Sequence, residues 1–338
     1  RDLFEDAIRA VASAAVWYDD QTVDGDRLTL SFAKAAANGG AALANYAEVI
    51  GRLKGDRQRQ GARARDNLTG HMFDVRARIL INAAGPWSAT LLEASGVQMR
   101  WPLLKAMNLV TSRPARRAAL VAPTRAGRAL VVPPWQGRTV VGTSESPDER
   151  QAEDQSARQP EVDSLLDEVN EAFPALALKP DEVTLVHRGI VPAARVGGRL
   201  SLLSHSRVID HADAGSPELV SVVGVKYTTA RAVAERAVDL VLKKLGRLPV
   251  RCRTAETLLP DASLEDRNPA DGIAHAIREE MAHTLVDVVV RRTGLGAAGY
   301  PGDAVAADVA KRMQTELSWS DERKAQEMFE KYIRGYSR

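Results

Sequence analysis

One stretch of the sequence, residues 219–231, constrains the fold more than any other. It reads Leu-Val-Ser-Val-Val, then Gly224, then Val-Lys-Tyr-Thr-Thr, and an alanine-rich amphipathic segment follows. A β-branched apolar run, a glycine and two threonines before a helical pattern predict a buried strand, a tight turn and a helix start. The chain therefore contains a strand-loop-helix unit at this point.

The turn of this unit is suited to negative charge. Backbone N–H groups in the first turn of a helix have no partner within the helix, and Thr228 or Thr229 can cap only some of them. The remaining donors and the helix dipole favour a surface anion by about 0.3–1 kcal/mol. Lys226 adds a full charge, so a small anion or a cofactor ring that gains negative charge on reduction would be stabilised here. The alternative is an ordinary strand-to-helix turn with a solvated lysine.

Composition narrows the partners that the chain can have. The 338 residues suffice for about two or three domains, and 45% hydrophobic with 27% charged residues is ordinary for a soluble globular protein. Acidic and basic residues are interspersed and the net charge is +2, so no nucleic-acid partner is expected. The single Cys252 excludes an internal disulfide, and the histidines lack metal-ligand spacing, so no metal site is expected. Runs of about 18 apolar residues and signal-peptide features are absent.

A second loop of small residues follows a strand predicted at 77–82. Its residues are Ala83, Ala84, Gly85, Pro86 and Trp87. Small residues at the end of a buried strand let a large flat group approach the backbone. The alternative is a tight helix cap, because Ser88 and Thr90 open a helical pattern.

Short apolar runs between these two loops, separated by Arg, Pro and Gly turns, predict an antiparallel sheet. The runs lie at 103–111, 118–122, 129–132, 138–141, 183–186 and 199–203, with a helix predicted at 161–173. Earlier, an arginine-rich run at 54–68 predicts a hairpin loop, and a helix from Asp26 is expected to stop at Gly39. Beyond a linker at 249–269, helices are predicted at 272–293, 303–317 and 320–332.

Four motifs occur in the same order as in one known family. Residues 80–87 read Leu-Ile-Asn-Ala-Ala-Gly-Pro-Trp, residues 134–143 Pro-Trp-Gln-Gly-Arg-Thr-Val-Val-Gly-Thr, and residues 222–229 Val-Val-Gly-Val-Lys-Tyr-Thr-Thr. Residues 276–295 include Arg-Glu-Glu-Met and Val-Val-Arg-Arg-Thr-Gly-Leu. Over nearly its whole length the chain resembles the FAD-dependent glycerol-3-phosphate dehydrogenases of the glycine/D-amino-acid oxidase superfamily.

The resemblance implies FAD as the cofactor and an α/β (α+β) fold class. We expect a Rossmann-like FAD-binding layer at 1–90 and 218–248, an inserted antiparallel-sheet substrate domain at 91–217 and a helical C-terminal domain at 249–338. The layer is expected to be incomplete, because the chain begins with Arg1 and no Gly-rich dinucleotide fingerprint follows an early strand.

The resemblance also assigns roles to particular residues. Those expected to contact the cofactor are Ala83, Ala84, Gly85, Pro86, Trp87, Gly224, Val225, Lys226, Tyr227, Thr228 and Thr229. The substrate phosphate is expected to meet Lys226, Arg207 and Arg188, because a dianion needs several converging cations. Arg207, in Ser-Arg-Val-Ile-Asp, matches the family's (Ser/Thr)-Arg pattern, with an arginine at a sheet edge as the alternative.

Two positions depart from the family pattern. Val191 stands where the phosphate-binding arginine is expected, and Arg188 replaces that arginine only if the extended chain bends at Gly189. Asn108 stands where family members commonly carry a histidine, so a candidate base is lost. His187 and His205 lie near the expected site and could take a proton from a substrate hydroxyl, a structural or exposed histidine being the alternative.

The activity implied by the resemblance is oxidation of sn-glycerol 3-phosphate to dihydroxyacetone phosphate by hydride transfer to FAD, with electrons passed to a quinone or another acceptor. The implied location is cytoplasmic, with peripheral contact at the inner membrane, and a homodimer is left open. Val191 and Asn108 leave open a related FAD-dependent oxidoreductase acting on another hydroxy or amino substrate. The absent fingerprint leaves open a flavin-free remnant that only binds a partner.

Overall fold

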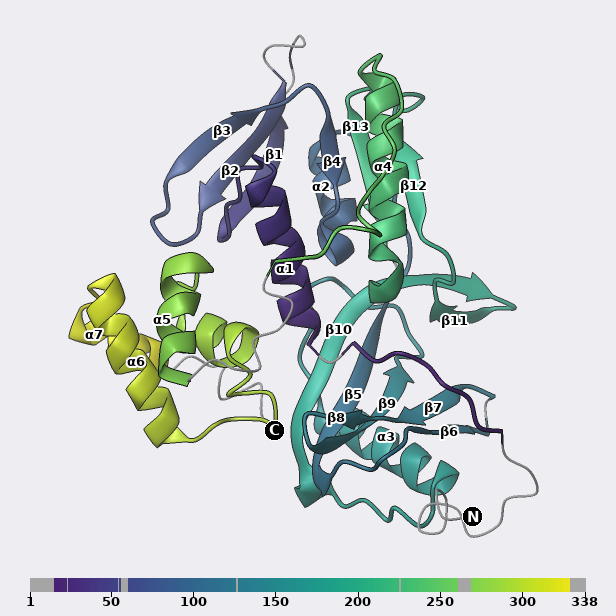
Figure 1. Ribbon diagram of the computed structural model, residues 1–338. Helices are drawn as coiled ribbons and strands as arrows, with labels where there is room; N and C mark the ends of the chain where they lie inside the picture. The colour runs from purple at the N-terminus through teal and green to yellow at the C-terminus, as the bar shows by residue number, and fades with distance from the viewer. Residues whose placement is uncertain are drawn as a thin grey trace.

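The computed structural model describes residues 15–22, 24–53, 55, 60–125, 127–224, 226–260 and 269–328. This part of the chain forms two three-stranded sheets and one seven-stranded sheet. In Figure 1 the two small sheets lie in the upper half of the molecule, the large sheet lies below them, and the C-terminal helices lie at the left. Among the described residues, no helix combines the length and the apolar character needed to cross a membrane.

A short parallel pair of strands joins two segments that are far apart in the sequence. Strand β4 (Leu80–Asn82) pairs with β13 (Leu219–Val223), and β12 (Arg207–Asp210) pairs antiparallel with the other edge of β13. The β-branched residues of β13 are mostly buried, as the apolar run predicts. The two segments therefore form one layer, and both strands end at the same edge of the sheet.

A short turn and a helix follow each strand of this pair. Helix α2 (Ser88–Ala94) follows the 3₁₀ turn η1 (Gly85–Trp87), and α4 (Ala230–Lys244) follows the 3₁₀ turn η3 (Tyr227–Thr229). Helix α4 contacts β12 and β13 and ends before Gly246, whose φ of +67° suits glycine. The predicted strand-loop-helix unit at 219–231 is thus present, with α4 standing beside the sheet (Figure 1).

The large sheet has the strand order β11-β10-β5-β9-β7-β6, with β8 paired to β9. Its strands are β5 (Leu103–Pro114), β6 (Leu120–Pro123), β7 (Ala129–Val132), β8 (Pro134–Trp135), β9 (Arg138–Glu145), β10 (Val183–Val196) and β11 (Arg199–Leu202). The pairing is antiparallel throughout, as the turn-rich sequence predicts. Strand β10 is much longer than the predicted run at 183–186, because Gly189 continues the extended pairing with β5.

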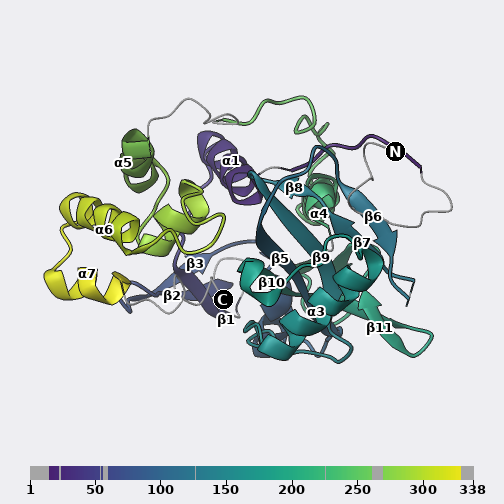
Figure 2. The same ribbon diagram turned by 90° about the horizontal axis from the view of Figure 1, so that it is seen from below.

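Helix α3 (Gln159–Ala172) covers one face of this sheet and crosses it in Figure 2. Its residues Leu165 and Val169 are fully buried against Met107 and Leu109 of β5 and Val186 of β10. Full burial of one such side chain contributes roughly 1.5–3 kcal/mol. Turn η1, which follows β4, contacts β10 of this sheet.

Helix α1 (Gly25–Asn38) precedes the second small sheet, which contains β1 (Ala47–Leu53), β2 (Gly61–Asp66) and β3 (Met72–Arg76). The Asp24 carboxylate caps α1 by accepting the Arg27 N–H at 2.8 Å, and Gly40 follows the helix with φ +92°. The predicted hairpin loop at 54–68 is wrong in part, because it contains β2. Strand β2 alternates small residues with arginines, and its Ala64 is buried while Arg63 and Arg65 are exposed. The arginines made this segment resemble a polar loop in the sequence.

The C-terminal helices are α5 (Pro269–Glu279), the π-helix η4 (Asp287–Arg292), α6 (Asp303–Leu317) and α7 (Asp321–Met328). The prediction of one helix over 272–293 is wrong, because α5 ends at Glu279 and Met281 has φ +54°. Buried apolar residues of these helices, including Leu285 and Met313, form a core of their own. The last part of the helix predicted at 320–332 lies outside the described residues.

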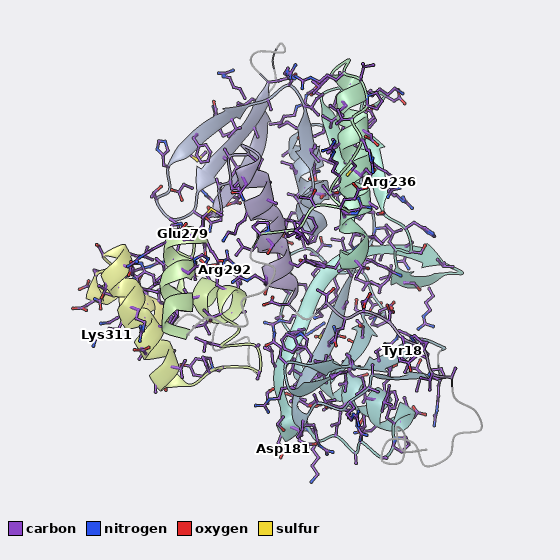
Figure 3. All side chains as sticks on the ribbon, viewed as in Figure 1. Tyr18, Asp181, Arg236, Glu279, Arg292 and Lys311 are labelled. Carbon is purple, nitrogen blue, oxygen red and sulfur yellow. The ribbon has the colours of Figure 1, made fainter. Side chains whose placement is uncertain are left out.

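Buried polar contacts join these helices to α1. Glu280, with 1% of its side chain exposed, forms ion pairs with Arg27 at 2.5 Å and Lys34 at 3.6 Å, and His275 Nε2 lies 3.0 Å from the same carboxylate oxygen. Arg27 also donates to the backbone oxygen of Arg292 at 2.8 Å. Figure 3 shows Arg292 on the side of the C-terminal helices that faces α1. We call Glu280, Arg27, Lys34 and His275 the Glu280 cluster.

Candidate functional site

The two loops predicted to bind the cofactor lie together at one sheet edge. Turn η1 follows the carboxyl end of β4, and η3 follows the carboxyl end of β13. Ligands of α/β sheets bind outside the carboxyl ends of parallel strands. Asn82 holds the two strand ends together, since its Nδ2 donates to the Ser88 backbone oxygen at 3.0 Å and to Ser221 Oγ at 3.3 Å.

An apolar groove of about 460 Å³ runs between this edge and α4. It is lined by Ile81, Ala83, Val222, Gly224, Lys226, Tyr227, Ala230, Val233, Ala234, Ala237 and Val238. Ile81 is 47% exposed and Val238 is 50% exposed, although both are large apolar residues. The groove thus offers an apolar surface with one cation at its end.

Both glycines of the loops leave space for a ligand. An added Cβ at Gly85 or Gly224 would meet no atom within 4 Å. Gly85 also has φ +57°, a conformation that strains side chains other than glycine. Trp87, beside Gly85, is 43% exposed. The backbone at this edge is therefore open to the close approach of a broad, flat molecule.

The start of α4 keeps its donors uncapped by side chains. Thr229 makes no capping hydrogen bond, because its Oγ1 donates instead to the backbone oxygen of Lys226 at 3.0 Å. Lys226 is exposed and forms no ion pair with the described residues. The turn therefore combines free N–H groups, the helix dipole and a free ammonium, which all favour negative charge. Val225 lies outside the described residues.

Arg207 is brought to this edge by the pairing of β12 with β13. It lies opposite Val223, the residue before Gly224, and its side chain is exposed. No ion pair within the described ranges engages its guanidinium. Arg207 and Lys226 are thus two unpaired cations near the same turn.

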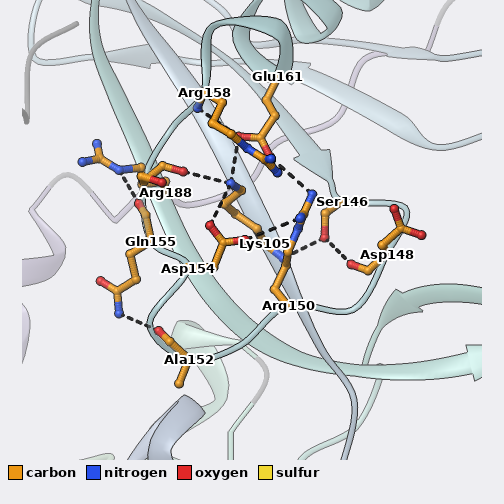
Figure 4. A network of polar contacts seen from close by, with 11 residues as sticks. Lys105, Ser146, Asp148, Arg150, Ala152, Asp154, Gln155, Arg158, Glu161 and Arg188 are labelled. Carbon is orange, nitrogen blue, oxygen red and sulfur yellow. Dashed lines mark hydrogen bonds and ion pairs between the residues drawn. The ribbon is translucent and has the colours of Figure 1, made fainter.

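Arg188 is held on the other face of the large sheet. Its Nε donates to the Gln155 backbone oxygen at 2.6 Å and its Nη1 to the Val186 backbone oxygen at 3.1 Å. The pairing of β10 with β5 continues through Gly189 without a bend. Arg188 therefore lies on the α3 side of the sheet, where Figure 4 shows it beside Gln155, and Val191 lies on the opposite side. The bend that would let Arg188 replace the expected arginine is absent.

Lys105 belongs to the same buried network on the α3 side of the sheet (Figure 4). Its side chain is 1% exposed, and its Nζ donates to Glu161 Oε2 at 2.8 Å and to the Ser156 backbone oxygen at 2.9 Å. Burial raises the pKa of Glu161, but hydrogen bonds from Lys105 and Arg158 outweigh it and lower the pKa below its ordinary value. The network fixes the loop before α3 and leaves Lys105 unavailable to a ligand.

A second cavity of about 330 Å³ lies where five separated segments of the chain meet. It is lined by Asp24, Gly25, Asp26, Trp135, Gln136, Leu185, His187, Tyr227, Val290, Gly294, Gly296 and Ala297. Tyr227 closes one side, because its hydroxyl donates to the Gly25 backbone oxygen and contacts Thr29. We call it the His187 cavity. Sequence reasoning missed its acidic and C-terminal lining, since no local pattern brings residues 24, 135, 187 and 294 together.

Asn108 is held against the Gly-Thr end of the 134–143 motif. Its Oδ1 accepts a hydrogen bond from Thr143 Oγ1 at 2.8 Å. A Cβ on Gly142 would lie 2.2 Å from the same oxygen, and Gly142 has φ +156°. Glycine at this position therefore makes room for the Asn108 carboxamide.

Comparison with known proteins agrees with the motifs. Residues 1–240 match the FAD dependent oxidoreductase family, and residues 269–324 match the C-terminal domain of alpha-glycerophosphate oxidase. A glycerol-3-phosphate dehydrogenase of Synechocystis sp. is 25% identical over 386 residues, covering 93% of this chain and 69% of that protein. A mitochondrial relative of that name in Arabidopsis thaliana is 33% identical over 246 residues, covering 68% of this chain and 37% of that protein.

A solved structure shows the same fold. The X-ray structure of the glycerol-3-phosphate dehydrogenase from Bacillus halodurans complexed with FAD superposes with a TM-score of 0.75 at 23% identity. It covers 92% of this chain, and this chain covers 73% of that structure. The two open loops, the apolar groove and the uncapped helix start fit a flat cofactor that becomes anionic on reduction. The chain therefore belongs to the FAD dependent oxidoreductase family, and it is similar to glycerol-3-phosphate dehydrogenases over nearly its whole length.

Proposed function

We propose that this protein, as a whole, oxidises sn-glycerol 3-phosphate to dihydroxyacetone phosphate and passes the electrons to a quinone. The observation that supports this most is the meeting of two distant loops at the end of the parallel pair, beside two unpaired cations. FAD supplies the acceptor for the substrate's hydride when it is bound. The quinone and a peripheral place at a membrane rest on the resemblance.

The cofactor is proposed to lie along the two loops. The residues proposed to hold it are Ala83, Ala84, Gly85, Pro86, Trp87, Gly224, Lys226, Tyr227, Thr228 and Thr229. Their exposure at one sheet edge supports this assignment, and the free N–H groups before α4 would stabilise negative charge on the reduced ring.

The substrate phosphate is proposed to bind Lys226 and Arg207. Both side chains lie near the Gly224 turn and are free to accept an anion. Arg188 has no part in this proposal, because it is hydrogen-bonded on the α3 side of the large sheet. Two cations remain where three were expected from the sequence.

A second candidate function is oxidation of a different hydroxy or amino substrate by the same flavin. Val191, at the position expected for a phosphate-binding arginine, packs with the buried apolar residues Leu104, Ala193 and Leu200. An apolar side chain there weakens the case for a dianionic substrate.

Anaerobic mixing of the flavin-loaded, full-length protein with glycerol 3-phosphate tests the proposal and separates the two candidates. We expect the visible flavin absorption to bleach with glycerol 3-phosphate and not with glycerol at the same concentration. Bleaching by an uncharged polyol or an amino acid, with none by glycerol 3-phosphate, would support the second candidate instead.

Arg207→Ala is expected to raise the KM for glycerol 3-phosphate by about 10- to 150-fold. A hydrogen bond to a charged group contributes roughly 1.5–3 kcal/mol, and each 1.4 kcal/mol corresponds to a factor of ten. Steady-state kinetics with an artificial electron acceptor measures the effect. Arg312→Ala, on the exposed side of α6, is the matched control and should leave the KM unchanged. An unchanged KM in Arg207→Ala would remove Arg207 from the binding site.

A further inference from the structure

We propose that His187 accepts the proton of the substrate's hydroxyl group. This inference rests on the proposed function, because an alcohol can lose a hydride from carbon only as its O–H proton is also removed. A positioned base contributes about 10²- to 10⁴-fold to such a step. The structure places one imidazole in the cavity that borders the proposed cofactor turn.

The first argument is the position of the His187 cavity. His187 and Tyr227 line the same space, and Tyr227 begins the turn that is proposed to lie under the cofactor. The cavity also borders the apolar groove, because Tyr227 lines both. A small substrate between the sheet and the cofactor turn would therefore be within reach of the imidazole.

The second argument is the pairing of β10 with β5. His187 lies directly opposite Asn108 in the antiparallel register, and both lie on the sheet face away from α3. The Asn108 oxygen is engaged by Thr143, and a carboxamide has no basic nitrogen. Of these two residues, His187 is therefore the one whose side chain can accept a proton.

The third argument is the protonation state of the His187 imidazole. Burial lowers the pKa of His187 below its ordinary value of 6.5, so the ring is neutral at pH 7 and one nitrogen keeps a lone pair. Trp135 contacts the ring edge to face, with 5.0 Å between centroids and 87° between planes. No hydrogen bond from the described residues engages the ring nitrogens. The ring is thus oriented by packing and free to accept a proton.

Three other titratable groups line the same cavity. The Tyr227 hydroxyl donates to Gly25, and the Asp24 carboxylate caps α1. Burial and the neighbouring Asp24 raise the pKa of Asp26, while Arg291 and Arg292 oppose this shift. Asp26 is therefore the competing base, and the experiment must distinguish it from His187.

The proposed step balances in atoms and electrons. The O–H bond of the secondary alcohol breaks and its proton moves to an imidazole nitrogen of His187. The carbinol C–H bond breaks with its electron pair, and the carbon is oxidised to a carbonyl as hydride leaves for the flavin acceptor of the proposed function. The proton on His187 then returns to water.

The test compares His187→Gln with Asp26→Asn in the flavin-loaded, full-length protein. For His187→Gln we expect anaerobic flavin reduction by glycerol 3-phosphate to slow by about 10²- to 10⁴-fold. The dissociation constant for the substrate should stay within about threefold, and the rise of the wild-type rate with pH below neutrality should disappear. Asp26→Asn, which also alters the cavity lining, should keep this pH dependence whatever its effect on the rate. Loss of the pH dependence in Asp26→Asn alone would overturn the proposal.

A second readout does not depend on activity. In a histidine NMR titration of the protein, the signal lost in His187→Gln should titrate below the ordinary pKa of 6.5 and shift when glycerol 3-phosphate is added. A signal that titrates normally and ignores the substrate would overturn the assignment. If wild-type flavin is not reduced by glycerol 3-phosphate, the proposed function fails. If glycerol 3-phosphate reduces the flavin equally fast in the wild-type protein and in His187→Gln, this inference alone fails.

Discussion

Replacing Glu280 by glutamine is expected to lower the free energy of unfolding by about 3–5 kcal/mol. Glu280 is 1% exposed and neutralises Arg27, whose side chain is 10% exposed, at the contact between α1 and the C-terminal helices. Glutamine keeps the shape but leaves the Arg27 guanidinium buried without a counter-charge. Denaturant unfolding followed by circular dichroism measures the loss.

The same cluster predicts a pH dependence of stability. Burial raises the pKa of Glu280, but Arg27, His275 and Lys34 outweigh it and hold the pKa below the ordinary 4.5. A lowered pKa in the folded state means that the unfolded state takes up the proton first as the pH falls. The stabilisation by Glu280 should therefore be complete near neutral pH and decline below pH 4.5, and Glu280→Gln should lack this part of the decline.

The matched control for Glu280→Gln is Asp308→Asn. Asp308 pairs with Arg312 on the exposed face of α6, and such pairs contribute roughly 0.3–0.5 kcal/mol. Equal effects of the two variants, or an unchanged acid transition in Glu280→Gln, would contradict the role given to the Glu280 cluster.

The second large effect is expected for Glu161→Gln, at about 3–5 kcal/mol of lost stability. This change removes the charge that faces the fully buried Lys105 ammonium at 2.8 Å, and it preserves an oxygen to accept the Arg158 N–H (Figure 4). Replacing both members of a buried ion pair changes the stability little. Lys105→Met combined with Glu161→Gln should therefore recover a substantial part of the free energy of unfolding that Glu161→Gln loses. A double-mutant cycle from chemical denaturation gives this coupling.

The control for that cycle is Glu171→Gln on the exposed side of α3, where Glu171 pairs with Arg125. A change below about 0.5 kcal/mol is expected there. Additive effects of Lys105→Met and Glu161→Gln would show that the two buried charges do not stabilise each other.

Local signals predicted much of the fold. The β-branched run before Gly224 marks β13, and the glycines after α1 and α4 mark where these helices end. These signals act within a few residues, so they depend little on distant contacts. The four domain boundaries stay predictions, and β12, which the range 91–217 includes, pairs with β13 in the other sheet.

Tertiary contacts account for what the sequence did not predict. No Gly or Pro lies between Glu280 and Asp287, yet α5 ends at Glu279, and both of these carboxylates make contacts outside α5. Glu280 reaches Arg27 of α1, and Asp287 accepts the backbone N–H groups of His283 and Thr284. Periodicity carries no information about these partners.

For a similar reason, only part of the candidate site could be predicted from the sequence. Strand alternation correctly placed Arg188 and Val191 on opposite faces, but it could not show that β10 passes Gly189 without a bend. The opposition of His187 and Asn108 depends on the register of two strands, which is set by the whole sheet.

The pairing of β4 with β13 also has a consequence for the order in which the protein is made. Asn82 and Ser221, which hydrogen-bond across the pair, are separated by 139 residues. A growing chain therefore releases the first of the two proposed cofactor loops from the ribosome long before the second is made. Closing so long a loop costs less entropy once the intervening sheet has folded and brought its own ends together. Early folding of the inserted sheet is therefore expected to favour assembly of the proposed flavin site.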